Sequence, residues 1–494
     1  MVDVTDAVDR IDVDAVNAKH KRELYKSRVK IFPKRVSGTF RSLKWWIMAL
    51  TLGVYYITPW IRWDRGPSAP DQAVLVDLWN ERFYFFFIEI WPQEFFYVAG
   101  LLIMAGIGLF LVTSTVGRAW CGYTCPQTVW VDLFLVVERW IEGDRNARMK
   151  LDKEPWSSGK LRKLISKHIL WLAIAVATGG AWIFYFADAP TLAVNLVTLQ
   201  SPLIAYSTIG VLTATTYVFA GFMREQVCTY MCPWPRIQAA MLDEDSLTVT
   251  YNGWRGETRA RQKERHTQPD AQFGDCIDCN LCVAVCPQGI DIRDGQQLEC
   301  ITCALCIDAC DSVMTKIGKP RGLISYATLK DYQANEAGQR THTTWRSFVR
   351  PRTMVYITLW SVAGLAMLFM LLTRDRLDIN VLHDRNPVFV ALSDGGIRNG
   401  YTVKILNMEP RARSFRLSVD GIAGASLALA GSTAPASRTL QVDAEPDKQR
   451  TVKIYVTAYP AYLQGETTSF RFTVEELDGE ETAHYDALFS APKP

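Results

Sequence analysis

The sequence predicts a multi-domain membrane protein with about five transmembrane α-helices, a cytoplasmic domain built on two cysteine runs, and a C-terminal all-β domain of immunoglobulin-like type. Three observations lead to this fold class: long uncharged apolar stretches, eight cysteines gathered between Cys276 and Cys310, and a cysteine-free tail with alternating apolar residues. The chain has 494 residues, which leaves room for several domains. Its net charge of +3 decides little.

Four long stretches carry almost no charge, and each can cross the ~30 Å core of a bilayer as a helix. They are Phe95–Val116, Ile169–Ala187, Leu203–Met223 and Thr353–Thr373. A fifth stretch, Trp45–Ile61, is shorter and contains Pro59, but tryptophans flank it as in an aromatic belt. The apolar piece Phe83–Trp91 is too short to cross, and we expect it to be interfacial or re-entrant.

Basic residues predict the orientation, because Lys and Arg accumulate on the cytoplasmic side. They are frequent in the first 44 residues and in segments 117–167 and 224–352, whereas segment 64–94 has two and segment 188–202 has none. The polar N-terminus has no apolar core typical of a cleavable signal peptide. The N-terminus and the cysteine runs should therefore lie inside and the C-terminal tail outside, although Arg374 and Arg376 count mildly against this.

The predicted domain boundaries follow from these patterns. We expect a basic cytoplasmic arm at 1–44, whose part from Lys19 to Lys44 touches anionic lipid. We further expect a four-helix membrane region at 45–242, a cysteine-rich cytoplasmic domain at 243–352, a fifth transmembrane helix at 353–373 and an outer β-sandwich at 377–494.

The eight clustered cysteines form two runs with the spacing C-x2-C-x2-C-x3-C. This spacing is typical of bacterial ferredoxins, in which the fourth cysteine of each run ligates the other [4Fe–4S] cluster. The cysteines assigned to one cluster are Cys276, Cys279, Cys282 and Cys310, and those assigned to the other are Cys300, Cys303, Cys306 and Cys286. The sequence therefore predicts a bacterial-type 2[4Fe–4S] ferredoxin domain that moves single electrons.

Two alternatives to iron–sulfur clusters fit less well. Zinc sites usually show two CxxC pairs with a spacer, and disulfides are rare on the reducing cytoplasmic side. One departure from the motif is present: the first run ends in Cys286-Pro287, but the second ends in Cys310-Asp311. The missing proline should loosen the local turn, yet it removes no ligand.

The remaining cysteines form two matching CxxxCP motifs, Cys121 to Cys125 and Cys228 to Cys232, each after a predicted membrane helix and each preceded by an arginine. A proline after each second cysteine suits the start of a new helix, so Val129–Ile141 and Pro235–Leu242 are expected to be amphipathic surface helices. If the two halves pack side by side, the four thiolates converge at the inner membrane face. Such a set suits Cu(I), Zn(II) or an iron–sulfur centre, with Met231 and His168 as possible additions. Buried structural cysteines or a redox disulfide remain the alternatives.

The tail alternates apolar and polar residues in the way half-buried strands do. Turn signals at Asp394-Gly395-Gly396, Asn399-Gly400 and Asp478-Gly479 separate the runs. About seven short strands predict an immunoglobulin-like sandwich with a docking or scaffolding role.

Several long motifs resemble the cytochrome c oxidase accessory proteins called CcoG, FixG or RdxA. They include CGYTCPQTVWVDLFLVVERWIEGD, EQVCTYMCPWPRIQAAMLDEDSLTVT, GDCIDCNLCVAVCPQGIDIRDG and RNPVFVALSDGGIRNGYTVKILN, and the likeness extends from about Pro33 to the last strands. The resemblance implies a bacterial inner-membrane protein with a periplasmic C-terminal domain that assists maturation of a cbb-type oxidase. It further implies reduction of Cu(II) to Cu(I), with Cys121, Cys125, Cys228 and Cys232 as catalytic copper ligands. The partners would be oxidase assembly factors, copper transporters or chaperones, and an electron donor that the sequence does not identify.

Two other functions compete with a cupric reductase. The protein could be a quinol-linked electron-transfer subunit like NapH or NosR, which share CxxxCP pairs and two clusters, although NapH-like chains stop after the ferredoxin part. It could also be a non-enzymatic scaffold for oxidase assembly. No nucleophile–base set, phosphate loop or nucleic-acid motif is present in the sequence.

Overall fold

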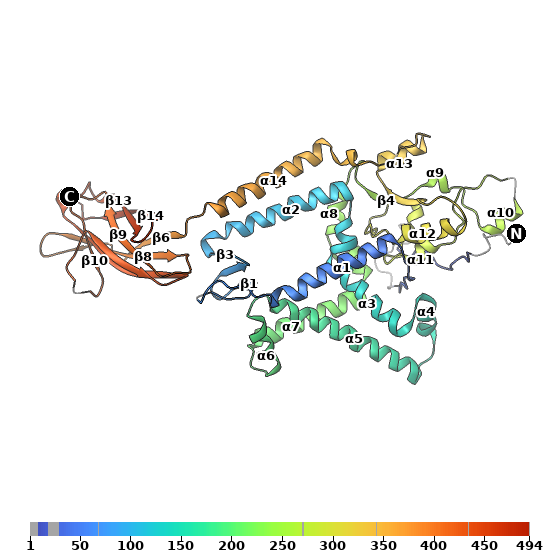
Figure 1. Cartoon of the computed structure of the whole chain (residues 1–494), viewed down its shortest axis with the longest axis horizontal. Coiled ribbons are helices and arrows are strands. Elements are labelled where there is room, and N and C mark those ends of the chain that lie inside the picture. The colour runs from blue at the N-terminus through green and yellow to red at the C-terminus, as the bar shows by residue number, and fades with distance from the viewer. Residues whose placement is uncertain are drawn as a thin grey trace. The chain divides into compact units, whose positions relative to one another are not determined.

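A computed structural model describes residues 8–17, 29–67, 69–268, 271–341, 343–432 and 434–493 (Figure 1). The chain divides into two compact units. The first holds the described residues up to Ile61 together with Gln72–Met367, and the second holds Leu368–Pro494 with the short segment Arg62–Asp71. The described residues of the predicted regions 45–242 and 243–352 fall in the first unit apart from the short segment Arg62–Asp71, and the boundary at Met367 lies within the predicted helix 353–373.

Four helices of the described chain are long and apolar enough to cross a membrane, which confirms the four long stretches. They are Pro92–Val116, Ser158–Ile183, Leu203–Met223 and Pro351–Leu372. In Figure 1 they contain α2 (Phe96–Val116, after the 3-10 turn η4, Pro92–Glu94), α5 (Ser158–Ile183), α7 (Leu203–Thr216, continued by the π-helix η6, Tyr217–Met223) and α14 (Pro351–Leu372). Helices α2 and α14 pack on each other, with the rings of Phe110 and Tyr356 6.0 Å apart.

The fifth predicted span, Trp45–Ile61, falls mostly in α1 (Thr39–Ile57), which is not among these four helices. Near its start, the buried Arg41 and Lys44 form ion pairs with Asp132 at 2.7 and 3.7 Å. Further along, α1 exposes large apolar side chains at helical spacing, namely Trp46, Leu50, Val54 and Ile57. Helix α1 thus has charged, ion-paired residues at its start and an exposed apolar stripe further along. That α1 crosses the membrane as a fifth helix stays a prediction.

The helices that follow the CxxxCP motifs are α3 (Pro126–Glu142) and α8 (Trp234–Met241). The prediction of a surface helix is wrong for α3. Its Phe134 stacks on Trp171 of α5 with ring centroids 5.0 Å apart, and its Glu138 pairs with Arg148 and Arg224. Helix α3 is thus buried among the helices of the first unit. The same unit also contains α4 (Arg145–Lys153) and α6 (Ala189–Val197).

Between α1 and α2 the chain forms a short 3-10 turn, η3 (Thr58–Trp60), and a small antiparallel sheet. Its strands are β1 (Val74–Asp77), β2 (Arg82–Phe85) and β3 (Ile88–Ile90). The piece Phe83–Trp91, predicted to be interfacial or re-entrant, forms most of β2 and all of β3, which pair antiparallel with Phe83 opposite Ile90 and Phe85 opposite Ile88.

The cysteine-rich domain is a small α/β fold closed by a two-stranded antiparallel sheet. The strands are β4 (Thr248–Tyr251) and β5 (Ile324–Ala327). Between them lie α9 (Gly253–Gly256), α10 (Gln262–Thr267), α11 (Leu281–Val285), η8 (Ile292–Asp294) and α12 (Leu305–Lys316), and after them α13 (Leu329–Glu336) and η9 (Trp345–Phe348). Val249, Ile277, Val313 and Ile324 belong to its buried core.

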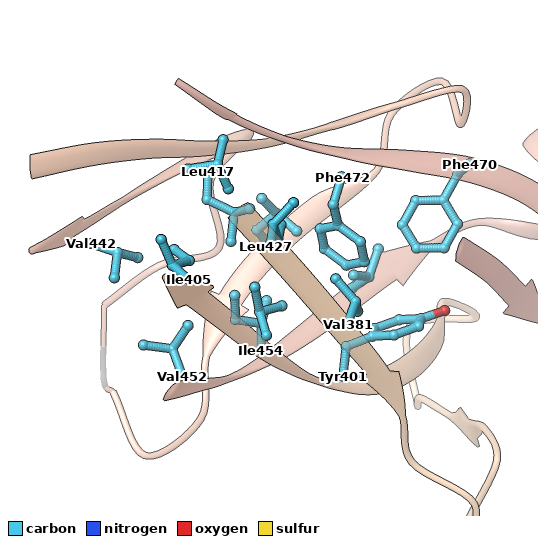
Figure 2. Packing of buried hydrophobic residues seen from close by; sticks show 14 of the residues in the cluster. Val381, Tyr401, Ile405, Leu417, Leu427, Val442, Val452, Ile454, Phe470 and Phe472 are labelled. Carbon is cyan, nitrogen blue, oxygen red and sulfur yellow. The ribbon is translucent and has the colours of Figure 1, made fainter. Parts of the chain in front are cut away.

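The second unit is a β-sandwich, as the alternating pattern predicted. One sheet has the order β10-β12-β8-β6 with β7 on β8, and the other has the order β11-β9-β13-β14. The strands are β6 (Leu377–His383), β7 (Val390–Ala391), β8 (Ile397–Asn407), β9 (Arg413–Asp420), β10 (Ser426–Leu429), β11 (Thr439–Ala444), β12 (Lys448–Ala458), β13 (Thr467–Glu476) and β14 (Thr482–Ser490), and a 3-10 turn, η10 (Pro460–Tyr462), follows β12. Figure 2 shows the core between the sheets, where Tyr401, Ile405, Leu417 and Phe472 are fully buried.

One predicted turn of this domain is wrong. Asn399-Gly400 lies inside β8, where the buried Asn399 side chain donates to the carbonyl oxygen of Ser490 at 2.8 Å and accepts from its backbone amide at 2.9 Å. The Asp384 carboxylate packs against Gly400, so a side chain at this position would have to displace it. The pair therefore marks a close approach inside a strand.

Candidate iron–sulfur and thiol site

The two cysteine runs form loops with the same backbone conformation. On either side of the second cysteine, the first run has left-handed residues at Asp278 (φ 50°) and Asn280 (φ 59°), and the second run has them at Thr302 (φ 52°) and Ala304 (φ 59°). Such residues turn the chain tightly around a centre. Helices α11 and α12 start directly afterwards, so the third cysteine of each run lies in a first helical turn.

The thiols of each run lie within electrostatic range of thiols of the other run. Burial raises the pKa of Cys310 to about 12, and the thiols of Cys279 and Cys276 in the other run add to the rise. Burial likewise raises the pKa of Cys286 to about 12, with a contribution from Cys303. We call Cys276, Cys279, Cys282 and Cys310 the first cysteine set, and Cys286, Cys300, Cys303 and Cys306 the second cysteine set.

The two runs differ in how they continue past their last cysteine. After Cys286, Pro287 follows the end of α11, whereas α12 runs on through Cys310 and Asp311 to Lys316. The Asp311 carboxylate also accepts a hydrogen bond from the amide of Gly322 at 2.8 Å. Asp311 thus allows a longer helix and anchors the chain that leads to β5, and the expected loosening of the turn does not occur.

The residues of the second cysteine set fit a [4Fe–4S] cluster. All four line one cavity, together with Cys282 of the first cysteine set and apolar side chains such as Ile290 and Leu305. Close by, the buried Thr302 hydroxyl and two nitrogens of buried Arg118 have no hydrogen-bond partner in the described chain. Unpartnered buried donors beside four thiols suit a negatively charged thiolate-bound cluster.

Both CxxxCP motifs form a single π-helical turn, η5 (Trp120–Thr124) and η7 (Val227–Met231). The turns close by equivalent hydrogen bonds, from the amide of Cys125 to the Trp120 oxygen at 2.9 Å and from that of Cys232 to the Val227 oxygen at 2.8 Å. Single π turns often mark functional sites. Helix α3 begins at Pro126, and α8 begins just after Pro233, as the prolines predicted.

The structure brings the four cysteines of the two motifs close to one another, and we call them the thiol quartet: Cys121, Cys125, Cys228 and Cys232. Burial raises the pKa of Cys228 to about 12, and the other three thiols contribute. The Cys121 thiol donates a hydrogen bond to the side-chain oxygen of Gln238 at 2.9 Å. Among the described residues, no three His, Cys, Asp or Glu side chains are arranged to hold a single metal ion. The four thiols thus interact with one another, although no three of them converge on a single ion position.

The first CxxxCP motif lies directly on the loop that carries the second cysteine set. A Cβ built on Gly122 would be 2.6 Å from the Ile301 carbonyl oxygen and 3.1 Å from Cys303 Cα. The Tyr123 hydroxyl donates to the carbonyl oxygen of Cys303 at 3.3 Å. Cys121, Ile301 and Cys303 belong to one buried cluster. The quartet and the second cysteine set therefore share a dry contact surface.

The two predicted additional ligands differ in position, since Met231 lies in the same π-helical turn as Cys228 and His168 lies on α5. Met231 is half exposed (51%). The His168 ring nitrogen Nδ1 is 3.0 Å from the Tyr217 hydroxyl, and the ring stacks on Phe222. It lines a separate cavity of about 510 Å³ with Trp171 and Arg224. The structure thus does not join His168 to the quartet.

The described residues that precede Lys19–Lys44, the stretch predicted to touch lipid, bind the ferredoxin domain, and the lipid contact stays a prediction. The amide of Ile11 donates to the carbonyl oxygen of Cys279 at 3.0 Å, and that of Asn17 donates to Gly289 at 3.0 Å. Arg10 pairs with Asp278 at 3.4 Å. Much of the basic part of the arm, residues 18–28, lies outside the described residues.

Sequence reasoning missed Arg118, Tyr123 and Gln238 as members of this site. An arginine before each CxxxCP motif was visible in the sequence, but the sequence did not show which of the two, Arg118 or Arg224, lies at the cysteine runs. Arg118 donates to the carbonyl oxygen of Leu298 in the ferredoxin domain, whereas Arg224 pairs with Glu138 of α3. Only the first arginine therefore faces the cysteine runs.

Three family models match the chain. A 4Fe-4S dicluster domain matches residues 223–329, and a 4Fe-4S binding domain matches residues 98–144, which include Cys121 and Cys125. An IG-like fold at the C-terminus of FixG matches residues 367–492.

Full-length relatives are similar as well. The nitrogen fixation protein FixG of Rhizobium meliloti (strain 1021) is 60% identical over 509 residues, which cover 98% of this chain and 97% of that protein. Protein RdxB of Cereibacter sphaeroides is 56% identical, with 94% of this chain and 97% of that protein covered. A crystal structure of a FixG-related protein from Vibrio parahaemolyticus matches 24% of this chain and 96% of its own at 24% identity and a TM-score of 0.20. The chain is an iron–sulfur electron-transfer protein that belongs to the FixG/RdxA family.

Proposed function

We propose that this protein is a membrane-bound oxidoreductase that assists assembly of cbb-type cytochrome c oxidase by reducing Cu(II) to Cu(I). The observation that carries the proposal is the direct contact of the Cys121 loop with the backbone of Ile301 and Cys303. An electron-carrying domain and a soft-metal thiol set share one surface. Thiolates select Cu(I), so reduction and capture of the product suit the same four residues.

The two cysteine sets and the thiol quartet have different roles in this proposal. Two [4Fe–4S] clusters, when bound, supply single electrons. We assign one cluster to the first cysteine set and the other to the second cysteine set. The chain holds the second set in a cavity from which buried apolar residues exclude water, and it holds the thiol quartet against the same loop.

The thiol quartet is the proposed catalytic site, with copper as substrate. Burial raises the pKa of Cys121 to about 11, so without metal its thiol is protonated near neutral pH. Metal binding then releases protons, because thiolates are the ligands. Copper transporters or chaperones are the proposed source and recipients of the ion.

The proposed location is the bacterial inner membrane, with the N-terminus and ferredoxin domain in the cytoplasm and the sandwich in the periplasm. The lysine and arginine distribution supports this. Opposite sides for the two termini require an odd number of crossings, so α1 must cross in addition to α2, α5, α7 and α14. The apolar stripe of α1 from Trp46 to Ile57 supports a lipid-facing role. Reporter fusions at both termini test this, and signals on the same side would contradict it.

The decisive experiment measures Cu(I) production by protein in proteoliposomes. The chain is purified anaerobically, its clusters are reduced, Cu(II) is added, and Cu(I) is followed with a chelator. We expect the variant with all four quartet cysteines changed to Ser to lose this activity while it retains full iron content. Met231→Leu, at a half-exposed residue of the same turn, is the matched control and should stay active. An unchanged rate in the quartet variant would contradict the proposal.

A second candidate function is quinol-linked electron transfer, and the 510 Å³ cavity favours it. Its walls combine the rings of His168, Trp171 and Phe222 with the charged residues Glu142 and Lys167. An aromatic wall with a hydrogen-bonding histidine on helix α5 suits a quinone head group. Cluster reduction by quinol in membranes, slowed by His168→Ala, would support this function, and absence of any reduction would remove it.

A further inference from the structure

Arg118 lies between the two thiol-bearing parts of the site. It follows the end of α2, is only 4% exposed, and donates through Nη1 to the carbonyl oxygen of Leu298. It lines a cavity of about 450 Å³ together with Cys300 and Thr302 of the second cysteine run. Three residues further along the chain comes Cys121.

The positive charge of Arg118 reaches thiols on both sides. Burial raises the pKa of Cys121 to about 11, and the Arg118 guanidinium opposes part of this rise. Burial also raises the pKa of Cys300 to about 11, and Arg118 again acts in the opposite direction. One guanidinium is therefore within electrostatic range of the quartet and of the second cysteine set.

No carboxylate neutralises this charge in the described part of the chain. Nε and Nη2 of Arg118 are buried without a hydrogen-bond partner. Asp243 and Glu244 line the same cavity, but Asp243 pairs with Arg350 and Arg352 at 2.5 and 2.9 Å, and neither acid forms an ion pair with Arg118.

The first cysteine set also has a buried arginine nearby, but this arginine forms ion pairs. Arg293, near Cys282, pairs with Asp278 at 2.9 Å and with Asp291 at 2.6 Å. Asp278 also pairs with the more exposed Arg10 and Arg261, at 3.4 and 3.6 Å. The buried arginine at the first cysteine set is therefore ion-paired, whereas Arg118 at the second set has no carboxylate partner among the described residues, although the backbone loops match.

We infer that Arg118 is a positioning residue whose unpaired charge makes the cluster on the second cysteine set easier to reduce than the cluster on the first, so that the electron rests beside Cys121. This inference rests on the two clusters of the proposed function. A thiolate-bound cluster is anionic and gains one further negative charge on reduction, and net charge and hydrogen bonds set its potential. A buried cation stabilises that extra charge strongly, because screening by water is weak there.

The second CxxxCP motif has an arginine at the equivalent position, which allows a direct comparison. Arg224 precedes the second CxxxCP motif as Arg118 precedes the first, but Glu138 and the carbonyl oxygen of Gly221 bind its guanidinium. Only the first motif has both the contact with Cys303 and the unpaired cation. Cys121 is therefore the electron entry of the quartet.

The first test is an EPR-monitored redox titration of full-length protein with dithionite. Cys310→Ser leaves the cluster of the second set, and Cys286→Ser leaves that of the first. We expect the cluster retained in Cys310→Ser to titrate at the higher potential. The reverse order or equal potentials would overturn the inference. Absence of clusters from the wild-type protein would instead contradict the proposed function.

The second test changes the arginine in otherwise wild-type protein. We expect Arg118→Gln to make reduction of the second-set cluster about tenfold less favourable, a shift of ~59 mV for one electron. Arg118→Lys, which keeps the charge, should shift it less in the same direction, and it serves if the Gln variant does not fold. A potential that is unchanged in both variants, or a shift confined to the first-set cluster, would overturn the inference.

Discussion

Gly122 lies against the carbonyl oxygen of Ile301 so closely that a Cβ at position 122 would be 2.6 Å from that oxygen. Gly122→Ala should therefore push the first CxxxCP turn away from the ferredoxin loop while it leaves all twelve thiols in place. We expect Cu(I) production to fall roughly tenfold to hundredfold, because small displacements of reacting groups are costly. The rate is measured on pre-reduced protein. Gly180→Ala, where a Cβ meets nothing within 4 Å, should change little.

The exchange of the fourth cysteines between the runs predicts which double variants lose both clusters. Cys276→Ser and Cys310→Ser should each leave roughly half of the wild-type iron, and their combination should lose no more, because both remove one cluster. Cys300→Ser combined with Cys310→Ser should lose nearly all iron. Iron per chain after anaerobic purification checks this. If the first pair lost both clusters, each run would hold its own.

Asp311→Pro would give the second run the proline that follows the first run, and yet it should damage this protein. Position 311 is inside α12, so proline removes a helical hydrogen bond, and it also removes the carboxylate that binds the Gly322 amide. We expect a loss of about 3 kcal/mol or more in the free energy of unfolding. Thermal unfolding and iron content measure the effect. Asp311→Ala isolates the loss of the carboxylate and should be milder.

The ion pairs of Asp132 with Arg41 and Lys44 are buried, and removal of one partner leaves uncompensated charge. Asp132→Ala should therefore destabilise the helical unit by about 3–5 kcal/mol. The exposed pair of Lys30 and Asp152 provides the control, since Asp152→Ala should cost about 0–1 kcal/mol. Thermal unfolding in detergent compares the two variants. Equal midpoints would show that Asp132 does not anchor α1 to α3.

Local patterns predicted much of this fold because their physical causes are local. Uncharged runs of about 20 residues need no partner to indicate a membrane helix. Alternation at Phe470, Phe472 and Val474 places them in the sandwich core, where they are buried. Cysteine spacing likewise predicted the equivalent loops, because a short step between ligands leaves few backbone conformations.

Long-range packing could not be predicted from the sequence. Asn399-Gly400 has the composition of a turn, but bonds to Ser490, nearly a hundred residues away, hold it in a strand. Helix α3 looked amphipathic because Asp132 and Glu138 are charged, and nothing local shows that their partners are buried with them. The contact of Gly122 with Ile301 joins residues 179 positions apart, and no short motif encodes it.

The first backbone amides of α1 find their hydrogen-bond acceptor in another part of the chain. Its side chains provide no cap, and instead the Asp308 carboxylate, between Cys306 and Cys310, accepts from the amides of Phe40 and Arg41 at 3.1 and 2.7 Å. The ribosome makes α1 more than 250 residues before Asp308. Until the last cysteine run has been synthesised and folded, the amides of Phe40 and Arg41 therefore lack this carboxylate and are left to water. Biogenesis of this protein thus links the seating of its earliest hydrophobic helix to the maturation of its ferredoxin domain.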